Sequence, residues 1–330
     1  MRAIVTHEYG SLDVLQLEDV DKPVPRADEL LVRVRAASVN AADGLLMHGW
    51  PYPMRSQIGW KRPRIKGLGL DFAGVVEAVG DAVTAFRPGD AVFGELAQDY
   101  AGATRAFAEY ICVAASSVVR KPEAVSFTEA AAVPLAGCTA LYAVRDYGQV
   151  RPGQHVLING AGGGVGTYAV QLAKHFGATV TGVCSDRKAG TVRDSGADRV
   201  IDYRQHDFTT DAMQYDVIVD IASSQGLLRC RRVLAPRGRF VWVGGPASGP
   251  WLGPLRPALN VLLMSLVSRR QRWLLVAKSS SAEDVAVLAG LLADGSLRPV
   301  IDRCYPLERA ADAIRHLQDG RACGKVVIEI

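Results

Sequence analysis

A glycine-rich stretch in the middle of the chain has residues whose types and spacing suit the binding of a phosphate group. The octapeptide NGAGGGVG (159–166) directly follows the apolar run HVLI. Backbone amides in such a loop, and at the start of a helix that follows it, bind a pyrophosphate. In the aligned pattern A-x-G-x-x-G, the middle glycine lets the backbone approach the phosphates, and the last lets helix and strand pack closely. The residues that this pattern assigns to the ligand are Ala161, Gly163, Gly164, Val165 and Gly166.

The elements expected on either side of the loop support this role. The segment HVLIN before it is typical of a strand, and ATVTGVC after it is typical of a second one. Between them, Val165, Ala169, Leu172 and Phe176 recur at helical spacing and form one apolar face. Strand, glycine turn, helix and strand in this order predict a dinucleotide-binding βαβ unit. The alternative is a tight structural turn between strand and helix.

The residues after the second strand bear on which dinucleotide binds. An NAD site places an acid about 20 residues past the loop, on the ribose 2′-hydroxyl. That position holds Cys184 or Ser185, Asp186 comes one or two residues late, and two cations follow. Hydroxyl and cationic groups suit a 2′-phosphate, whereas a carboxylate repels it. The sequence therefore favours NADPH, with ligands Ser185, Arg187, Lys188 and Tyr203; in the alternative, Asp186 binds the ribose of NADH and the cations are only solvated.

The segments that must position this site show two different patterns of predicted secondary structure. A chain of 330 residues favours two domains. From residue 1 to about 122, short strand-like runs alternate with Gly and Pro turns, which predicts a small antiparallel barrel or sandwich. From 123 to 278, strand runs alternate with helical patterns, which predicts a parallel sheet with helices on both faces. Residues 279–330 return to a mixed pattern of helix and strand.

Composition excludes several other classes of protein. Apolar residues make up 49% and charged residues 22%, with a net charge of +4, which gives no indication of a nucleic-acid partner. The six cysteines lack CxxC spacing, so we expect reduced thiols in a cytoplasmic protein. The N-terminus lacks the pattern of a signal peptide. The apolar run 257–267 is about half the ~20 residues that a membrane span needs. It predicts a helix in a core, lid or subunit contact, with attachment to a membrane surface as the alternative.

Five segments, in order and over nearly the whole chain, resemble the medium-chain dehydrogenase/reductase superfamily. The similarity is closest to its zinc-free quinone-oxidoreductase branch, which includes zeta-crystallin and related enone reductases. The chain also ends on GKVVIEI, which is typical of the family. The segments are GLDFAGVVEAVG (69–80), RPGDAVFG (87–94), AAAVPLAGCTALYAV (130–144), RPGQHVLINGAGGGVGTYAVQLAK (151–174) and GADRVIDY (196–203).

The resemblance implies an α/β protein in which a doubly wound Rossmann domain is inserted into a GroES-like, β-rich catalytic domain. The catalytic domain would comprise 1–122 and 279–330, and the NADP-binding domain 123–278. The resemblance further implies an active site in the cleft between them, a homodimer, and NADPH-dependent reduction of quinones or α,β-unsaturated carbonyls. Alternatives are a dedicated enoyl reductase of a biosynthetic pathway and a non-catalytic NADPH-binding or sensor protein.

The positions at which zinc-dependent relatives carry Cys, His and Cys ligands indicate that no metal is bound. They hold Asn40, Leu70 and Cys138 here, and one thiolate does not make a catalytic zinc site. Oxidation of an alcohol in this family relies on zinc as a Lewis acid, but reduction of a conjugated acceptor does not need one. Hydrogen-bond donors suffice to stabilise the charge that develops on the acceptor oxygen.

The resemblance assigns further residues to the coenzyme and the substrate. Asn40 would face the nicotinamide and the substrate and could donate to a carbonyl or a ribose; Asp43 is better explained as a capping residue. Tyr52 is a candidate acid or oxyanion donor, with loop packing as the alternative. Thr139, with a helix cap as its alternative, and the strand end Val243, Gly244 and Gly245 are candidate contacts of the nicotinamide half. Arg321 and Lys325 are left out because their spacing departs from the family by about one residue.

Overall fold

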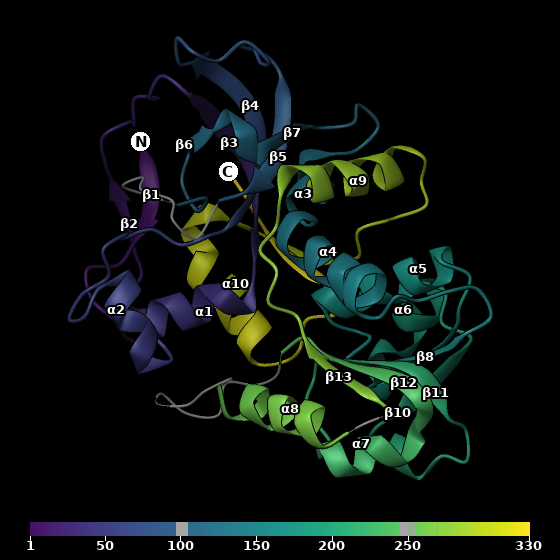
Figure 1. Ribbon diagram of the computed structural model, residues 1–330. Helices are drawn as coiled ribbons and strands as arrows, with labels where there is room; N and C mark the ends of the chain where they lie inside the picture. The colour runs from purple at the N-terminus through teal and green to yellow at the C-terminus, as the bar shows by residue number, and fades with distance from the viewer. Residues whose placement is uncertain (97–104, 245–250, 252–254, 269) are drawn as a thin grey trace. The chain divides into compact units, whose positions relative to one another are not determined.

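The computed structural model describes residues 1–96, 105–244, 251, 255–268 and 270–330, and it divides into two compact units (Figure 1). The first unit comprises Met1–Ala136 and Ser280–Ile330, and the second comprises Gly137–Ser279.

The first unit is built on a largely antiparallel sheet. In its longest strand, β3, only Arg33 and Arg35 are exposed, and the second half is buried, as expected for a strand that enters a core. In the described residues the sheet order is β14-β15-β3-β4-β5-β7, with β6 also pairing with β3 and with β1-β2 as a separate pair. The strands are β1 (Arg2–Val5), β2 (Gln16–Asp19), β3 (Glu29–Val39), β4 (Asp71–Val79), β5 (Ala91–Glu95), β6 (Tyr110–Ala114), β7 (Val118–Arg120), β14 (Ile301–Pro306) and β15 (Lys325–Glu329).

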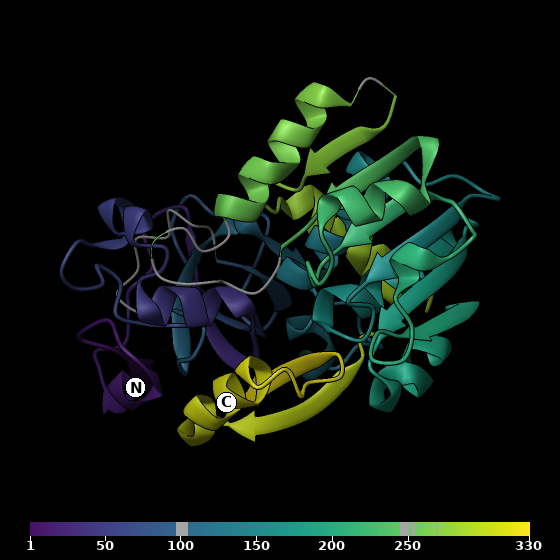
Figure 2. The ribbon, with the colours of Figure 1, turned by 90° about the horizontal axis from the view of Figure 1, so that it is seen from below.

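Short helices cover this sheet. Helix α10 lies against β14 and β15, which Figure 2 shows together in yellow, and also contacts α1. The core between them includes Phe72, Phe107, Ile314 and Val326, all of them buried. The helices are α1 (Ala41–His48), α2 (Arg55–Ile58), α3 (Phe127–Ala131), α9 (Ala282–Ala293) and α10 (Ala310–Gln318); α4 (Pro134–Leu141) continues the chain into the second unit.

The second unit contains a parallel sheet with the order β10-β9-β8-β11-β12-β13 among its described residues. All of these neighbours are paired in parallel. Helices α5 and α6 lie on one face and α7 and α8 on the other, which is the expected doubly wound Rossmann arrangement (Figure 1). The strands are β8 (His155–Asn159), β9 (Thr179–Cys184), β10 (Arg199–Asp202), β11 (Tyr215–Asp220), β12 (Leu234–Trp242) and β13 (Arg272–Leu275); the helices are α5 (Gly164–His175), α6 (Ala189–Asp194), α7 (Leu227–Val233) and α8 (Leu255–Val267).

The division between the units lies further along the chain than the boundary at 122/123 expected from the sequence. The reason is α3, which packs against β3, β4, β5 and β15 of the first unit. Its N-terminus is capped by Ser126, whose hydroxyl accepts from the amide of Glu129 at 3.1 Å. The second crossing, at Ser279/Ser280, is one residue from the expected position.

The apolar run near residue 260 forms α8, which packs along β13. Val261 and Met264 face the core of the second unit. The other side is exposed and carries Leu259, Leu262, Leu263, Leu266 and Val267. Within the described part of the chain, no helix is both long and apolar enough to span a membrane.

Candidate coenzyme and active-site residues

The glycine loop joins β8 to α5 at the carboxyl edge of the parallel sheet. A Cβ atom on Gly166 would lie 2.1 Å from the carbonyl oxygen of Gly160 and 2.7 Å from the backbone of Ala161, so only glycine fits there. A Cβ atom on Gly163 would meet its nearest neighbour at 3.6 Å. The loop is thus closed beneath Gly166, where helix and strand pack, and open at Gly163, where a ligand can approach the backbone.

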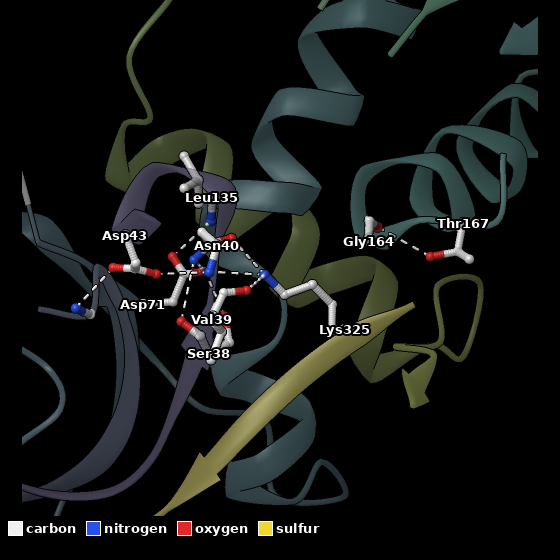
Figure 3. Close-up of polar contacts among 10 residues, drawn as sticks. Ser38, Val39, Asn40, Asp43, Asp71, Leu135, Gly164, Thr167 and Lys325 are labelled. Carbon is white, nitrogen blue, oxygen red and sulfur yellow. Dashed lines mark hydrogen bonds and ion pairs between the residues drawn. The ribbon is translucent and has the colours of Figure 1, made fainter. Parts of the chain in front are cut away.

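The first turn of α5 adds a hydrogen-bonding surface to this loop. Gly163 is the N-cap residue, and the hydroxyl of Thr167 donates to the carbonyl of Gly164 at 3.1 Å (Figure 3). The first amides of a helix have no acceptor within the helix. Together with the helix dipole they favour an anion at this end. The amides of Gly164 and Val165 therefore suit a pyrophosphate.

A basic turn follows the neighbouring strand β9. Ser185 is buried, and the amide of Lys188 donates to its carbonyl at 2.9 Å. A Cβ atom on Gly162 would lie 2.8 Å from both Cβ and Cδ of Lys188, so the lysine stem crosses the glycine loop. The amide of Tyr203 donates to the carbonyl of Cys184 at 3.2 Å, and the Tyr203 ring is half exposed. The fold thus gathers Ser185, Lys188 and Tyr203 around the carboxyl end of β9, with Lys188 against the loop, and Asp186 and Arg187 are exposed.

A polar group at the ends of β8, β11 and β12 escaped the sequence analysis. The buried Asp220 accepts from Nδ2 of Asn159 at 2.8 Å and from the amide of Ser223 at 2.9 Å. Burial raises the pKa of the Asp220 carboxyl to about 6. The Ser223 hydroxyl donates to the carbonyl of Gly244 at 2.6 Å and accepts from the Trp242 indole at 2.8 Å. These bonds fix the strand end next to the glycine loop.

The remaining coenzyme candidates of the second unit have less defined surroundings. The amide of Val243 donates to the carbonyl of Asp220 at 2.9 Å, so it continues the ladder beyond β12. Thr139 is half-buried in α4. Gly245 lies outside the described residues.

In the first unit, Asn40 lies where β3 ends and α1 begins. Its amide donates to Oδ2 of Asp43 at 2.7 Å, and Oδ1 of Asp43 accepts from the amide of Gly69 at 2.9 Å. Asp43 therefore caps α1 and fastens it to the segment before β4. Burial is the main cause that raises the pKa of Asp43 to about 6.

The next carboxylate, Asp71 at the start of β4, is fully buried and accepts three hydrogen bonds. Its Oδ2 accepts from Ser38 Oγ at 2.8 Å and from Asn40 Nδ2 at 2.9 Å. Its Oδ1 accepts from the amide of Leu135 at 2.9 Å (Figure 3). Burial raises the pKa of Asp71, although the nearby Lys325 ammonium and these hydrogen bonds oppose the rise.

Lys325, the first residue of β15, is buried beside these groups. Its Nζ donates to Asn40 Oδ1 at 2.6 Å and to the carbonyl of Val39 at 3.3 Å, and it lies 3.8 Å from Asp71 Oδ2. Burial lowers the pKa of this ammonium, and the neighbouring carboxylates counteract that effect. Figure 3 shows Lys325 reaching toward Asn40 from the last strand.

A fourth ionisable group, Glu95, also belongs to this part of the unit. It ends β5 and lies opposite Asp71 in the strand pairing. Its Oε2 is buried and has no hydrogen-bond partner within the described residues. Burial, reinforced by the Asp71 carboxylate, raises the pKa of Glu95 to about 7. Neither Glu95 nor Lys325 was in the set predicted from sequence.

Tyr52 lies in a different cluster, within a short turn after Pro51. The Arg55 guanidinium lies 4.6 Å from the Tyr52 ring centroid and 4.4 Å from that of Tyr9. Arg55 also donates to the carbonyl of Gly49 at 3.0 Å. The Tyr52 ring is thereby held in place by Arg55.

The donor set does not fit a catalytic zinc. Asn40 Oδ1 is bonded to an ammonium, Leu70 is a buried apolar residue and Cys138 is a buried thiol. In the ranges that the structure describes, no three His, Cys, Asp or Glu side chains gather into a possible metal site. No step through a metal follows from these residues.

Comparison with known proteins places this geometry in a family. Residues 26–123 match the family model described as alcohol dehydrogenase GroES-like domain, and residues 195–328 match the one described as zinc-binding dehydrogenase. The match to the first confirms the predicted GroES-like part of the fold.

Similar proteins match this chain over nearly its whole length. The quinone oxidoreductase of Mus musculus is 30% identical over 99% of this chain and 97% of its own. The 2-methylene-furan-3-one reductase of Solanum lycopersicum is 33% identical over 99% of this chain and 79% of its own. The structure of Escherichia coli quinone oxidoreductase complexed with NADPH has a TM-score of 0.82 at 26% identity, over 100% of both chains. The chain therefore belongs to the quinone-oxidoreductase branch of the medium-chain dehydrogenase/reductase superfamily.

Proposed function

We propose that this protein is an NADPH-dependent, zinc-independent reductase that transfers hydride to a quinone or an α,β-unsaturated carbonyl compound. The observation that carries the proposal is the glycine loop, open at Gly163 and crossed at Gly162 by the Lys188 stem. The names of the mouse and tomato relatives contain a quinone and a conjugated enone, and the Escherichia coli relative was solved with NADPH.

The second unit supplies the groups that hold the coenzyme. Amides at Gly164 and Val165 bind the pyrophosphate, and the loop at Ala161, Gly163 and Gly166 brings the backbone close to it. Ser185, Lys188 and Tyr203, with Arg187 beside them, bind the 2′-phosphate, because hydroxyl and cationic donors match that anion. Thr139 and the strand end Val243, Gly244 and Gly245 are assigned to the nicotinamide half.

When bound, the coenzyme would supply a hydride, which is one proton with two electrons, to the β-carbon or the ring of the acceptor. One proton from a side chain or from water completes the reduction. The phenol of Tyr52 is the proposed donor to the acceptor oxygen. Asn40 serves to orient the bound molecules, and the protein contributes alignment and exclusion of water.

We also propose that the protein acts as a homodimer through the second unit. In the described residues, β13 pairs only with β12, so its other edge is open. The exposed apolar side of α8 lies beside this strand. A second copy fits best, because it can extend the sheet and cover α8 at once. Sedimentation would show a dimer, and L262D/L266D would give a monomer that still binds NADPH. A cytoplasmic location stays a prediction.

The function is tested by following loss of reduced nicotinamide with a naphthoquinone, an alkyl enone and a nitroalkene. We expect turnover on at least one acceptor, with NADPH preferred over NADH. Tight NADPH binding by calorimetry without turnover on any acceptor would instead support a non-catalytic binding protein. Turnover confined to enoyl thioesters would support a dedicated enoyl reductase.

A further inference from the structure

Four ionisable side chains from distant parts of the sequence meet inside the first unit. Asp43 comes from α1, Asp71 from β4, Glu95 from β5 and Lys325 from β15. Asp43 and Asp71 are fully buried, and Lys325 is 3% exposed. Burial of charge is costly unless partners compensate it, so one ammonium among three carboxyl groups dominates the electrostatics of this cluster.

The neutral residue at the centre of this cluster is Asn40. Its Nδ2 donates hydrogen bonds to Asp71 Oδ2 at 2.9 Å and to the carbonyl of Ser38 at 3.3 Å. Its Oδ1 accepts from Lys325 Nζ at 2.6 Å. An ammonium can only donate and a carboxylate can only accept, so the two charges permit one orientation of the carboxamide.

This arrangement changes what Asn40 can do. Both of its N–H groups are occupied by Asp71 and Ser38, so the expected donation to a carbonyl oxygen is not available. An amide oxygen has two lone pairs, and Lys325 takes one. The second lone pair of Oδ1 is the remaining hydrogen-bonding site of the side chain. A partner of Asn40 must then be an O–H or N–H donor, and a ribose hydroxyl of the coenzyme has that chemistry.

We propose that Lys325 is a positioning residue for the reduction: together with Asp71 it fixes Asn40 as a hydrogen-bond acceptor for a donor group of the nicotinamide half of the coenzyme. The proposal rests on the proposed function insofar as Asn40 meets the coenzyme. Lys325 acts through Asn40 and needs no contact with the reacting atoms.

The proposal is tested with K325M, K325R, N40A and the double variant N40A/K325M in the full-length protein. Loss of a hydrogen bond to a charged group corresponds to roughly a 10- to 100-fold effect. We expect K325M and N40A each to lower the affinity for NADPH by that factor, measured as KM and by calorimetry. The double variant should be no worse than the poorer single variant, because both remove one contact. K325R should recover most of the loss.

The matched control is K22M, since Lys22 is an exposed lysine of the same unit that pairs with Glu77. It should leave NADPH affinity and turnover unchanged. Additive effects of N40A and K325M, or wild-type affinity in K325M, would overturn the proposal. If K325M does not fold, N40A and K325R still test the proposal. N40A must lower the affinity for NADPH, and K325R must keep that affinity within a few-fold of wild type.

A pH profile separates positioning from a purely structural role. Removing the ammonium leaves Asp43, Asp71 and Glu95 without their shared cation, so their carboxyl groups should hold protons to higher pH. In K325M the acid limb of kcat/KM should move upward by roughly one pH unit, and in K325R it should not move. A K325M profile that is lower but unshifted would contradict the proposal. If the wild type binds NADPH but turns over no acceptor, the proposed function fails, whereas the calorimetric cycle and its pH dependence still test Lys325.

Discussion

The two candidate regions of this protein are built in opposite ways. The coenzyme region of the second unit depends on backbone: a glycine loop, the first amides of α5 and the ends of parallel strands. The Asn40 region of the first unit depends on buried side chains whose charges balance one another. A backbone site leaves a local sequence pattern, whereas a charge cluster assembled from four elements leaves none. Substitutions in the coenzyme region should therefore act through steric clashes with the backbone. Substitutions in the Asn40 region should act through the loss of charge compensation.

The largest effect should come from the backbone region. G166A places a methyl group against the carbonyl of Gly160, so we expect about 2–3 kcal/mol less stability and a large loss of NADPH affinity. Denaturant unfolding and calorimetry measure both. The control is G190A in α6, where a Cβ atom meets nothing within 4 Å, and which should be about 0.5–1 kcal/mol more stable. Equal stability of G166A and wild type would show that the loop can relax.

The next effect concerns the charged edge of the coenzyme region. K188A removes the proposed donor to the 2′-phosphate, so KM for NADPH should rise roughly 10- to 100-fold while KM for NADH changes little. R193A, which changes an exposed arginine in the same stretch, serves as the control. Equal effects on both coenzymes would show that the 2′-phosphate assignment is wrong.

A third prediction tests the charge cluster through its pH dependence. Burial raises the pKa of Glu95 from its ordinary value of 4.5 to about 7, so the folded state binds more protons than the unfolded state between these values. Its contribution to the unfolding free energy therefore falls as the pH rises from about 4.5 to about 7. E95Q removes this dependence, and its stability relative to wild type should rise by about 1–3 kcal/mol between pH 5 and pH 8. A difference that stays constant with pH, in parallel unfolding curves, would argue against a proton on Glu95.

The smallest effect should come from the aromatic cluster that holds Tyr52. R55M removes the guanidinium between Tyr9 and Tyr52, and a cation–π contact is worth about 0.5–1 kcal/mol. KM for the acceptor should rise roughly two- to fivefold, with KM for NADPH unchanged. R62M, an exposed arginine in the same segment, is the control. A larger effect on NADPH than on the acceptor would place Tyr52 with the coenzyme instead.

The coenzyme region could be predicted from the sequence, whereas most of the charge cluster could not. The glycine loop, the helix after it and the alternation of strands and helices are local patterns, and the parallel sheet and the family were correctly inferred from them. Lys325 was left out because of its spacing, and its contact with Asn40 depends on the pairing of β15 with β3, which joins residues 285 positions apart. Glu95 gave no signal in the sequence, since only the register of β4 and β5 sets it opposite Asp71. Asn40 was identified by position, but its hydrogen-bonding role could not be read from its type.

Because β15 completes the sheet of the first unit, the order in which the chain is synthesised bears on how that unit folds. The second unit is one continuous segment, so all of its residues are made before Lys325 exists. Asp71 is made early, whereas the Lys325 ammonium that lies 3.8 Å from it belongs to β15, which is made after the whole of the second unit. We therefore expect burial of Asp71 in the first unit to be unfavourable until β15 has joined the sheet, whereas the inserted unit can fold earlier.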